Sequence, residues 1–285
     1  MTAPARIARY YDRSTWRFLR MGQSGAALAI HRPLWPAGTI STEVAAGHIN
    51  SLVADAAARE LGRVPEQVLD LGCGVGGTIL SLAQRWPHAE FTGLTLSPRQ
   101  VGLARRFATD RGLTSRCRFR VADFLDRGTD TPPADLAVAI ESAVHAPSSR
   151  DFFDAAYARL QIGGLLIVVD DMLAMPENAL APGEADLVAH FRRGWHLGRV
   201  ATSDELVTAA SDAGLSLRAD DDLTALLRLD RLRDHLLRVV GPVMARLRLE
   251  AIPLFANMIG GNALTCAYRA GIMRYRLLAF RKETS

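Results

Sequence analysis

The stretch that decides the fold is Val68-Leu-Asp-Leu-Gly-Cys-Gly-Val-Gly-Gly77. A short apolar run ends at Asp70, and four glycines follow directly before a segment with a helical pattern. Glycine allows a tight turn and lets a ligand approach the backbone closely. The first turn of a helix adds free N–H groups and the positive end of its dipole. The stretch therefore predicts a strand, a turn and a helix that together bind a nucleoside ligand.

Strands and helices are expected to alternate along the sequence beyond this stretch. The predicted strands are 67–71, 90–95, 117–121, 135–140, 165–169, 215–219 and 274–281. The predicted helices are 42–61, 77–85, 97–111, 151–160 and 203–213. The fifth strand is apolar throughout, as a buried parallel strand is. This order predicts an α/β protein with a Rossmann-like, doubly wound sheet of seven strands.

The flanking segments predict helical caps around this core. We expect an N-terminal helical cap at 1–64, the core at 65–171, an inserted helical cap at 172–202, and the rest of the core with a C-terminal helical segment at 203–285. Residues 2–23 are predicted to form a basic helix. Residues 223–249, rich in Leu and Arg, are predicted to form a long helix that serves as a cap or a subunit interface. We therefore expect a homo-oligomer, with a membrane surface or a partner helix as the alternative use of this segment.

Composition excludes several classes of protein. Of the 285 residues, 49% are hydrophobic and 22% charged, as in ordinary globular proteins. No apolar run approaches the roughly 18 residues of a membrane span, and the Arg-rich N-terminus lacks the apolar region of a secretory signal. A cytoplasmic location is therefore expected. The net charge of +4 comes without a clustered basic patch, so no nucleic-acid partner is predicted. Three scattered cysteines predict reduced thiols and no metal site.

The glycine turn alone leaves two ligands open. Its spacing, Gly72-x-Gly74-x-x-Gly77, also fits the fingerprint of dinucleotide-binding proteins. That fingerprint needs an acid about 20 residues later, at the end of the second strand, but residues 91–97 contain none. Asp70 would repel a pyrophosphate, whereas it suits the ammonium group of S-adenosylmethionine (SAM). The residues favour SAM, with a nicotinamide dinucleotide as the alternative.

Four runs together resemble a known family. They are VLDLGCGVGG (68–77), FTGLTLSPRQVGLARR (91–106), FRVADFLD (119–126) and AIESAVHAPSSRDFFDAAYARLQIGGLLIVVDD (139–171). They resemble the class I SAM-dependent methyltransferases, in particular the branch that includes tocopherol, sterol and prenyl C-methyltransferases. The resemblance covers residues 65–171. YYDRSTWRF (10–18) is similar to that branch's N-terminal cap over the SAM pocket.

The resemblance implies roles for individual residues in binding SAM and its product, S-adenosylhomocysteine (SAH). Asp70, Gly72 and Gly74 would contact the methionine part, with Cys73 fitted into the turn as a small side chain. Thr95 and Leu96 stand where many relatives place an acid for the ribose, so a hydroxyl, a water molecule or Gln100 would take that role. Asp123 would bind the adenine amino group, Phe124 would lie alongside the ring, and Glu141 would face the sulfonium.

The methyl acceptor is predicted from the residues after the fourth strand. An oxygen or nitrogen acceptor benefits from a general base, whereas attack by an alkene carbon leaves a cation that needs negative or π-rich surroundings. Glu141 and His145 are the candidate catalytic residues, and the alternative is that both only organise their loop. Aromatic residues in the expected caps would line an apolar acceptor site: Tyr10, Tyr11, Trp16 and Trp195. For Trp195, core packing is the alternative.

These observations lead to one expected function and two alternatives. The expected function is SAM-dependent C-methylation of a prenylated or terpenoid small molecule in specialised metabolism, with cyclisation driven by the resulting cation as a further step. Methylation of a small molecule on oxygen or nitrogen is the first alternative. A regulator of methyltransferase fold that binds SAM without turnover is the second.

Overall fold

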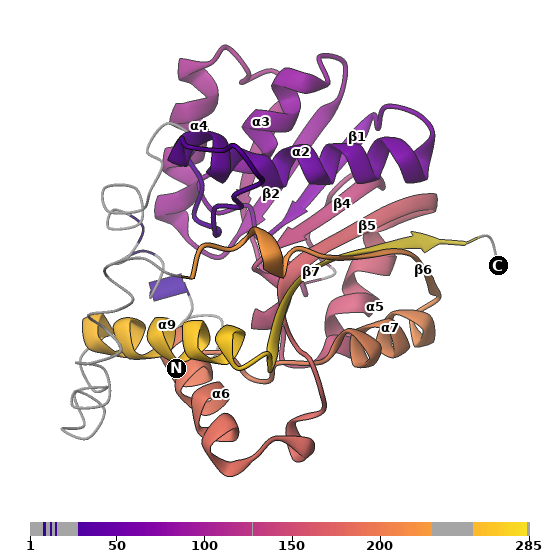
Figure 1. The fold of residues 1–285 in the computed structure, drawn as a ribbon. Helices are drawn as coiled ribbons and strands as arrows, with labels where there is room; N and C mark the ends of the chain where they lie inside the picture. The colour runs from indigo at the N-terminus through magenta and orange to yellow at the C-terminus, as the bar shows by residue number, and fades with distance from the viewer. Residues whose placement is uncertain are drawn as a thin grey trace.

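The computed structural model describes residues 8, 9, 12, 15, 28–126, 128–229 and 253–283. Its centre is a seven-stranded sheet in the order β3-β2-β1-β4-β5-β7-β6 (Figure 1). The strands are β1 (Gln67–Leu71), β2 (Glu90–Thr95), β3 (Cys117–Val121), β4 (Ala134–Ile140), β5 (Leu160–Leu173), β6 (Leu215–Asp222) and β7 (Met273–Lys282). The predicted Rossmann-like sheet of seven strands is confirmed. Strands β1 to β5 pair in parallel, while β7 runs antiparallel to both of its neighbours, β5 and β6.

Helices cover both faces of the sheet (Figure 1). One face carries α2 (Thr42–Leu61), α3 (Gly77–Arg85) and α4 (Pro98–Asp110), and the other carries α5 (Ser149–Arg159) and α7 (Ser203–Asp212). Side chains alternate across a strand. Val138 and Ile167 therefore belong to the hydrophobic core under α2, α3 and α4, while Ala139 and Val168 belong to the core under α5 and α7. The long apolar strands therefore supply two separate cores, as a doubly wound sheet requires.

Strands β5 and β6, the two neighbours of β7, extend further than predicted. Strand β5 begins at Leu160, which pairs with Ala134 of β4. It reaches Leu173 because β7 pairs with it as far as Met273. Strand β6 continues to Asp222 for the same reason, since Arg276 of β7 lies opposite it. Pairing with β7 therefore carries polar residues into a strand that hydrophobic pattern alone would end earlier.

The predicted helix at 223–249 is wrong at its first residues. Thr224–Leu226 form a single 3₁₀ turn, η3, and no helix follows as far as residue 229; residues 230–249 lie outside the described residues. The backbone here pairs outside a helix: the Leu223 N–H donates to the Tyr275 carbonyl at 2.8 Å, and the Trp35 N–H donates to the Leu226 carbonyl at 2.7 Å. The predicted basic helix at 2–23 also lies largely outside the described residues, of which 8, 9, 12 and 15 are helical.

Two helices pack together beside one end of the sheet (Figure 1). They are α6 (Pro182–Trp195), which falls in the expected insertion, and α9 (Pro253–Arg269), which the sequence pattern missed. They cross at two glycines: a Cβ atom added to Gly260 would lie 2.9 Å from the Cα of Gly194. The division of the protein into core and caps stays a prediction, but this helix pair brings the end of α6 and the residues of α9 toward the same end of the sheet as the glycine turn.

Candidate active site

The glycine turn after β1 has the geometry that its sequence predicts. Gly72, Gly74 and Gly76 have φ angles of +124°, +53° and +85°, a region that side chains with a Cβ atom rarely adopt. A Cβ atom at Gly72 would lie 2.4 Å from the Cβ of Ser142, so the segment after β4 approaches the turn directly. Gly76 then precedes the first turn of α3. The turn leaves backbone exposed to a ligand at the point where β1 and β4 meet.

A cavity opens at the carboxyl ends of these central strands, where sheets of this topology bind ligands. It contains about 1180 Å³ of space between atoms, part of it open to solvent. Most of the predicted site residues line it: Asp70, Gly72, Cys73, Gly74, Thr95, Leu96, Gln100, Phe124, Glu141, His145 and Trp195. Asp123 does not line it, and its carboxylate accepts the Leu125 N–H at 2.9 Å. Tyr10, Tyr11 and Trp16 lie outside the described residues.

Asp70 lies at one end of the cavity without a partner among the described residues. Its side chain is buried, and no described donor bonds to the carboxyl group. Burial raises the pKa of Asp70 to about 8. Burial and the nearby Asp70 also raise the pKa of the Cys73 thiol well above its usual range, which argues against a reactive thiolate. A cationic group placed beside Asp70 would restore its ionised form.

Thr95 and Gln100 satisfy each other beside the turn. The Thr95 hydroxyl donates to Gln100 Oε1 at 2.6 Å, and Gln100 Nε2 donates to the Thr15 hydroxyl at 3.3 Å. The Ser97 hydroxyl also bonds Asp12. The end of β2 has no acid of its own, and the neutral Thr95 and Gln100 side chains line this part of the cavity.

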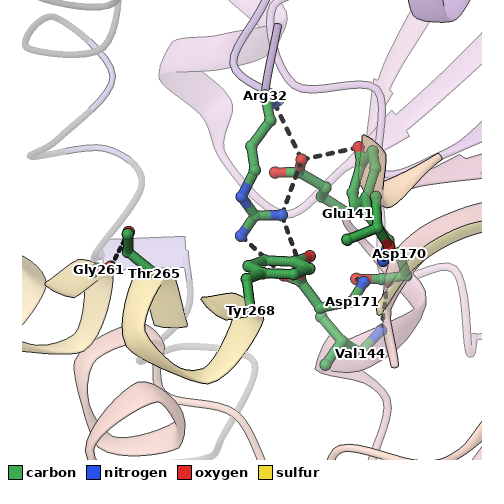
Figure 2. Close-up of polar contacts among 10 residues, drawn as sticks. Arg32, Glu141, Val144, Asp170, Asp171, Gly261, Thr265 and Tyr268 are labelled. Carbon is green, nitrogen blue, oxygen red and sulfur yellow. Dashed lines mark hydrogen bonds and ion pairs between the residues drawn. The ribbon is translucent and has the colours of Figure 1, made fainter. Parts of the chain in front are cut away.

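Glu141 lines the cavity directly after β4, next to Ser142 at the glycine turn, and has a strained backbone conformation with a φ of +51°. Such a conformation costs about 1–3 kcal/mol in a residue other than glycine and persists only where its surroundings hold it. Oε1 accepts three hydrogen bonds: from the Arg32 N–H at 2.9 Å, from Arg32 Nη1 at 3.3 Å and from the Tyr275 hydroxyl at 2.9 Å (Figure 2). Oε2 accepts none from the described residues, and 23% of the side chain is exposed. Oε2 is therefore the oxygen available to a ligand.

Arg32 links Glu141 to a second carboxylate, Asp171 (Figure 2). Arg32 Nη1 and Nη2 donate to the two oxygens of Asp171 at 2.9 and 2.7 Å, and the Tyr268 hydroxyl donates to Asp171 Oδ1. The guanidinium also lies 5.4 and 6.0 Å from the ring centres of Tyr275 and Tyr268. Sequence reasoning missed this cluster, because Arg32 lies 109 residues from Glu141 and 139 from Asp171.

Two further ionisable groups lie around this cluster. Asp170 accepts the N–H groups of Asp171 at 2.9 Å and Val144 at 3.1 Å. Burial and then the charge of Asp171 raise its pKa, which favours the neutral acid. Burial lowers the pKa of His145 to about 4, with His196 nearby adding to the effect. His145 is therefore a neutral imidazole near pH 7, and its lowered pKa makes it a weaker base than an ordinary histidine.

Trp195 lies between the cavity and the hydrophobic core, and its role toward the acceptor stays a prediction. It ends α6, lines the cavity and also packs against the larger hydrophobic core.

Within the described ranges, no group of three His, Cys, Asp or Glu side chains is placed to hold a metal ion. None of the helices described here has the length and apolar character that crossing a membrane requires.

Comparison with known proteins agrees with this geometry. Residues 68–164 match a family model described as a methyltransferase domain. The protein is 30% identical over 160 residues to methyltransferase phqN of Penicillium fellutanum, covering 56% of this sequence and 49% of the relative. It is 32% identical over 145 residues to the chloroplastic tocopherol O-methyltransferase of Arabidopsis thaliana, covering 50% and 41%. The match thus spans half or less of the length of these curated relatives.

A solved structure extends the likeness in fold to nearly the full length. The geranyl diphosphate C-methyltransferase of Streptomyces coelicolor A3(2), in complex with Mg²⁺, geranyl-S-thiolodiphosphate and SAH, is 19% identical with a TM-score of 0.76, and the match covers 99% of this protein and 98% of that one. At that identity the likeness concerns the fold. Together with the sheet order, it shows that the protein has the fold of the class I SAM-dependent methyltransferases, with a methyltransferase domain at residues 68–164 that is related in sequence to a tocopherol O-methyltransferase.

Proposed function

We propose that this protein is a SAM-dependent C-methyltransferase that acts on a prenylated or terpenoid small molecule. The observation that carries the cofactor part is Asp70, a buried carboxyl group that no described donor contacts, beside a turn that only glycines can form. An ammonium group would compensate Asp70, and the exposed backbone of the turn would admit the rest of an amino-acid moiety. These residues fit the methionine part of SAM.

The residues that line the cavity fall into two chemically different groups. We call these groups the cofactor end and the acceptor end, after their proposed use. The cofactor end comprises Asp70, Gly72, Gly74, Thr95 and Gln100. Thr95 and Gln100 would offer neutral hydrogen-bonding groups to the ribose, and Phe124 would lie against the adenine. When bound, SAM supplies a methyl group on a sulfonium and leaves as SAH.

The acceptor end comprises Arg32, Glu141, His145, Asp171 and Trp195. An alkene carbon that gains a methyl group becomes part of a cation, which then loses a proton to form a new double bond. Glu141 Oε2 would stabilise that cation and accept the proton, since Oε1 is already occupied by three donors. The neutral His145 ring is the second group able to accept a proton here.

Methylation on oxygen is the second candidate, and His145 is the observation that favours it. Its imidazole lines the cavity unprotonated near pH 7 and would take the proton of a hydroxyl acceptor, although burial makes it a weaker base than an ordinary histidine. The relative named for tocopherol O-methylation supports this alternative, while the geranyl diphosphate C-methyltransferase, with its prenyl ligand, supports C-methylation.

The proposal is tested by binding and by transfer. Calorimetric titration with SAM should show binding, and radiolabelled methyl groups should appear in prenylated acceptors from a panel that also contains phenols and amines. Glu141→Gln should keep SAM affinity and lose most of the transfer to an alkene carbon. Absence of SAM binding, or transfer to phenols alone, would contradict the C-methyltransferase.

A further inference from the structure

Among the residues that the structure describes, the acceptor end carries more negative than positive charge. Glu141 and Asp171 both form ion pairs with one guanidinium, that of Arg32. Arg32 is the sole lysine or arginine among the described residues that line the cavity. Two carboxylates sharing one cation leave one negative charge over. An anionic group on the acceptor would therefore meet an unfavourable field here.

Arg32 is not available to bind a phosphate group. Its guanidinium donates to both oxygens of Asp171 and to Glu141, and its own backbone N–H is held by Glu141 as well (Figure 2). The Asp171 side chain is 4% exposed. Turning Arg32 toward a phosphate would leave that carboxylate buried without its cation, which is strongly unfavourable.

The carboxylates offer few open oxygens to a magnesium ion that could carry a diphosphate. Both oxygens of Asp171 are held by Arg32, and Oδ1 also accepts the Tyr268 hydroxyl. Asp170 uses one oxygen for each of two backbone N–H groups. Only Glu141 Oε2 is left among these three side chains, so a magnesium ion here would have one protein oxygen and would depend on water and phosphate for its other ligands.

The nearby histidines do not change this balance. Burial lowers the pKa of His31, as it does that of His145, so neither ring adds positive charge near pH 7. Aromatic groups complete the surroundings, since Phe191 and Trp195 line the cavity and the rings of Tyr268 and Tyr275 lie against Arg32. Carboxylate and π surfaces both favour a positive charge.

We propose that the acceptor end selects a molecule whose reacting part is neutral or positively charged, and excludes one that carries a diphosphate. This inference rests on the proposed function and narrows its substrate class. The preferred acceptors are prenyl groups already attached to a neutral scaffold or to an amine. The same excess negative charge serves the reaction, because the acceptor becomes cationic when it gains the methyl group.

The test compares three probes that share one prenyl group and differ in charge. N,N-dimethylgeranylamine is positive near pH 7, geraniol is neutral, and geranyl diphosphate is anionic and is used with and without Mg²⁺. Each is titrated by calorimetry into the full-length protein saturated with SAH. We expect the amine to bind at least roughly tenfold more tightly than geraniol, because the excess carboxylate attracts its charge. Geranyl diphosphate should bind no more tightly than geraniol, even with Mg²⁺.

Two variants assign the preference to the acceptor end. Glu141→Gln should reduce the preference for the amine to within a few-fold of geraniol. Glu43→Gln, which removes the same charge from the exposed first turn of α2, should keep it. Tighter binding of geranyl diphosphate than of geraniol, or an unchanged preference in Glu141→Gln, would overturn the inference while leaving the methyltransferase intact. Failure of the unaltered protein to bind SAH would overturn the proposed function and the inference with it.

Discussion

Replacing Asp70 with asparagine should stabilise the ligand-free protein. The same replacement should weaken binding of the cofactor. Burial raises the pKa of this carboxyl group from 3.8 to about 8 in the folded state. Below about pH 4 both the folded and the unfolded protein hold the proton, and between about pH 4 and pH 8 only the folded protein does. The free energy of unfolding therefore falls as pH rises through this interval, by about 1.4 kcal/mol per pH unit. Over the whole shift the loss amounts to about 6 kcal/mol as an upper bound.

Urea unfolding of the ligand-free protein and of Asp70→Asn, between about pH 5 and pH 7, isolates this contribution. As the pH rises, the free energy of unfolding of the variant should increase relative to that of the unaltered protein by about 1.4 kcal/mol for each pH unit, since an amide does not titrate. Asp110→Asn, at the exposed end of α4, should show no such slope. Asp70→Asn should also weaken SAM binding roughly tenfold to hundredfold, as loss of a charged hydrogen bond does. A stability difference that stays constant with pH, or unweakened SAM binding, would refute the assignment of Asp70.

Three further predictions address the turn, the helix pair and the imidazole. Gly72→Ala should lower the free energy of unfolding by about 3 kcal/mol, because its Cβ atom would lie 2.4 Å from a side-chain carbon and its φ is +124°; Gly102→Ala, in open space on α4, should not destabilise in the same urea titration. Gly260→Val should force α6 and α9 apart and red-shift the tryptophan fluorescence of the protein through Trp195; an unchanged emission spectrum would argue that the crossing tolerates a larger residue. The ring of His145 should titrate near pH 4 in NMR spectra of the ligand-free protein, and a midpoint near 6.5 would contradict the burial that we describe.

Local pattern predicted the sheet because each of its signals lies within a few residues. Asp70 and the glycines after it mark the end of β1, and Ser97 with Pro98 marks the start of α4, where the Ser97 hydroxyl accepts the Gln100 N–H at 3.1 Å. Such caps and turns require no knowledge of the rest of the sequence. The same holds for the apolar strands, whose composition follows from burial on both faces.

The acceptor end could not be predicted in this way. Arg32 gains its role only because the loop before α2 folds across the ends of β4 and β5, where Glu141 and Asp171 stand. The two tyrosines come from α9 and β7, near the other end of the sequence. Helix α9 itself escaped notice because it is apolar around its circumference and contains two glycines, so it shows neither a polar face nor a clear strand pattern.

The late position of β7 in the sequence has a consequence for synthesis on the ribosome. This strand pairs with both β5 and β6, so until it emerges the long apolar β5 lies along an open edge of the nascent sheet. Open edges of this kind invite pairing with other polypeptides. The glycine turn is translated early, but Tyr275 reaches Glu141 only with β7. A nascent polypeptide thus passes through a stage in which the glycine turn is complete but Glu141 lacks its hydrogen bond from Tyr275 and one sheet edge is exposed. Chaperones would be most needed at this stage.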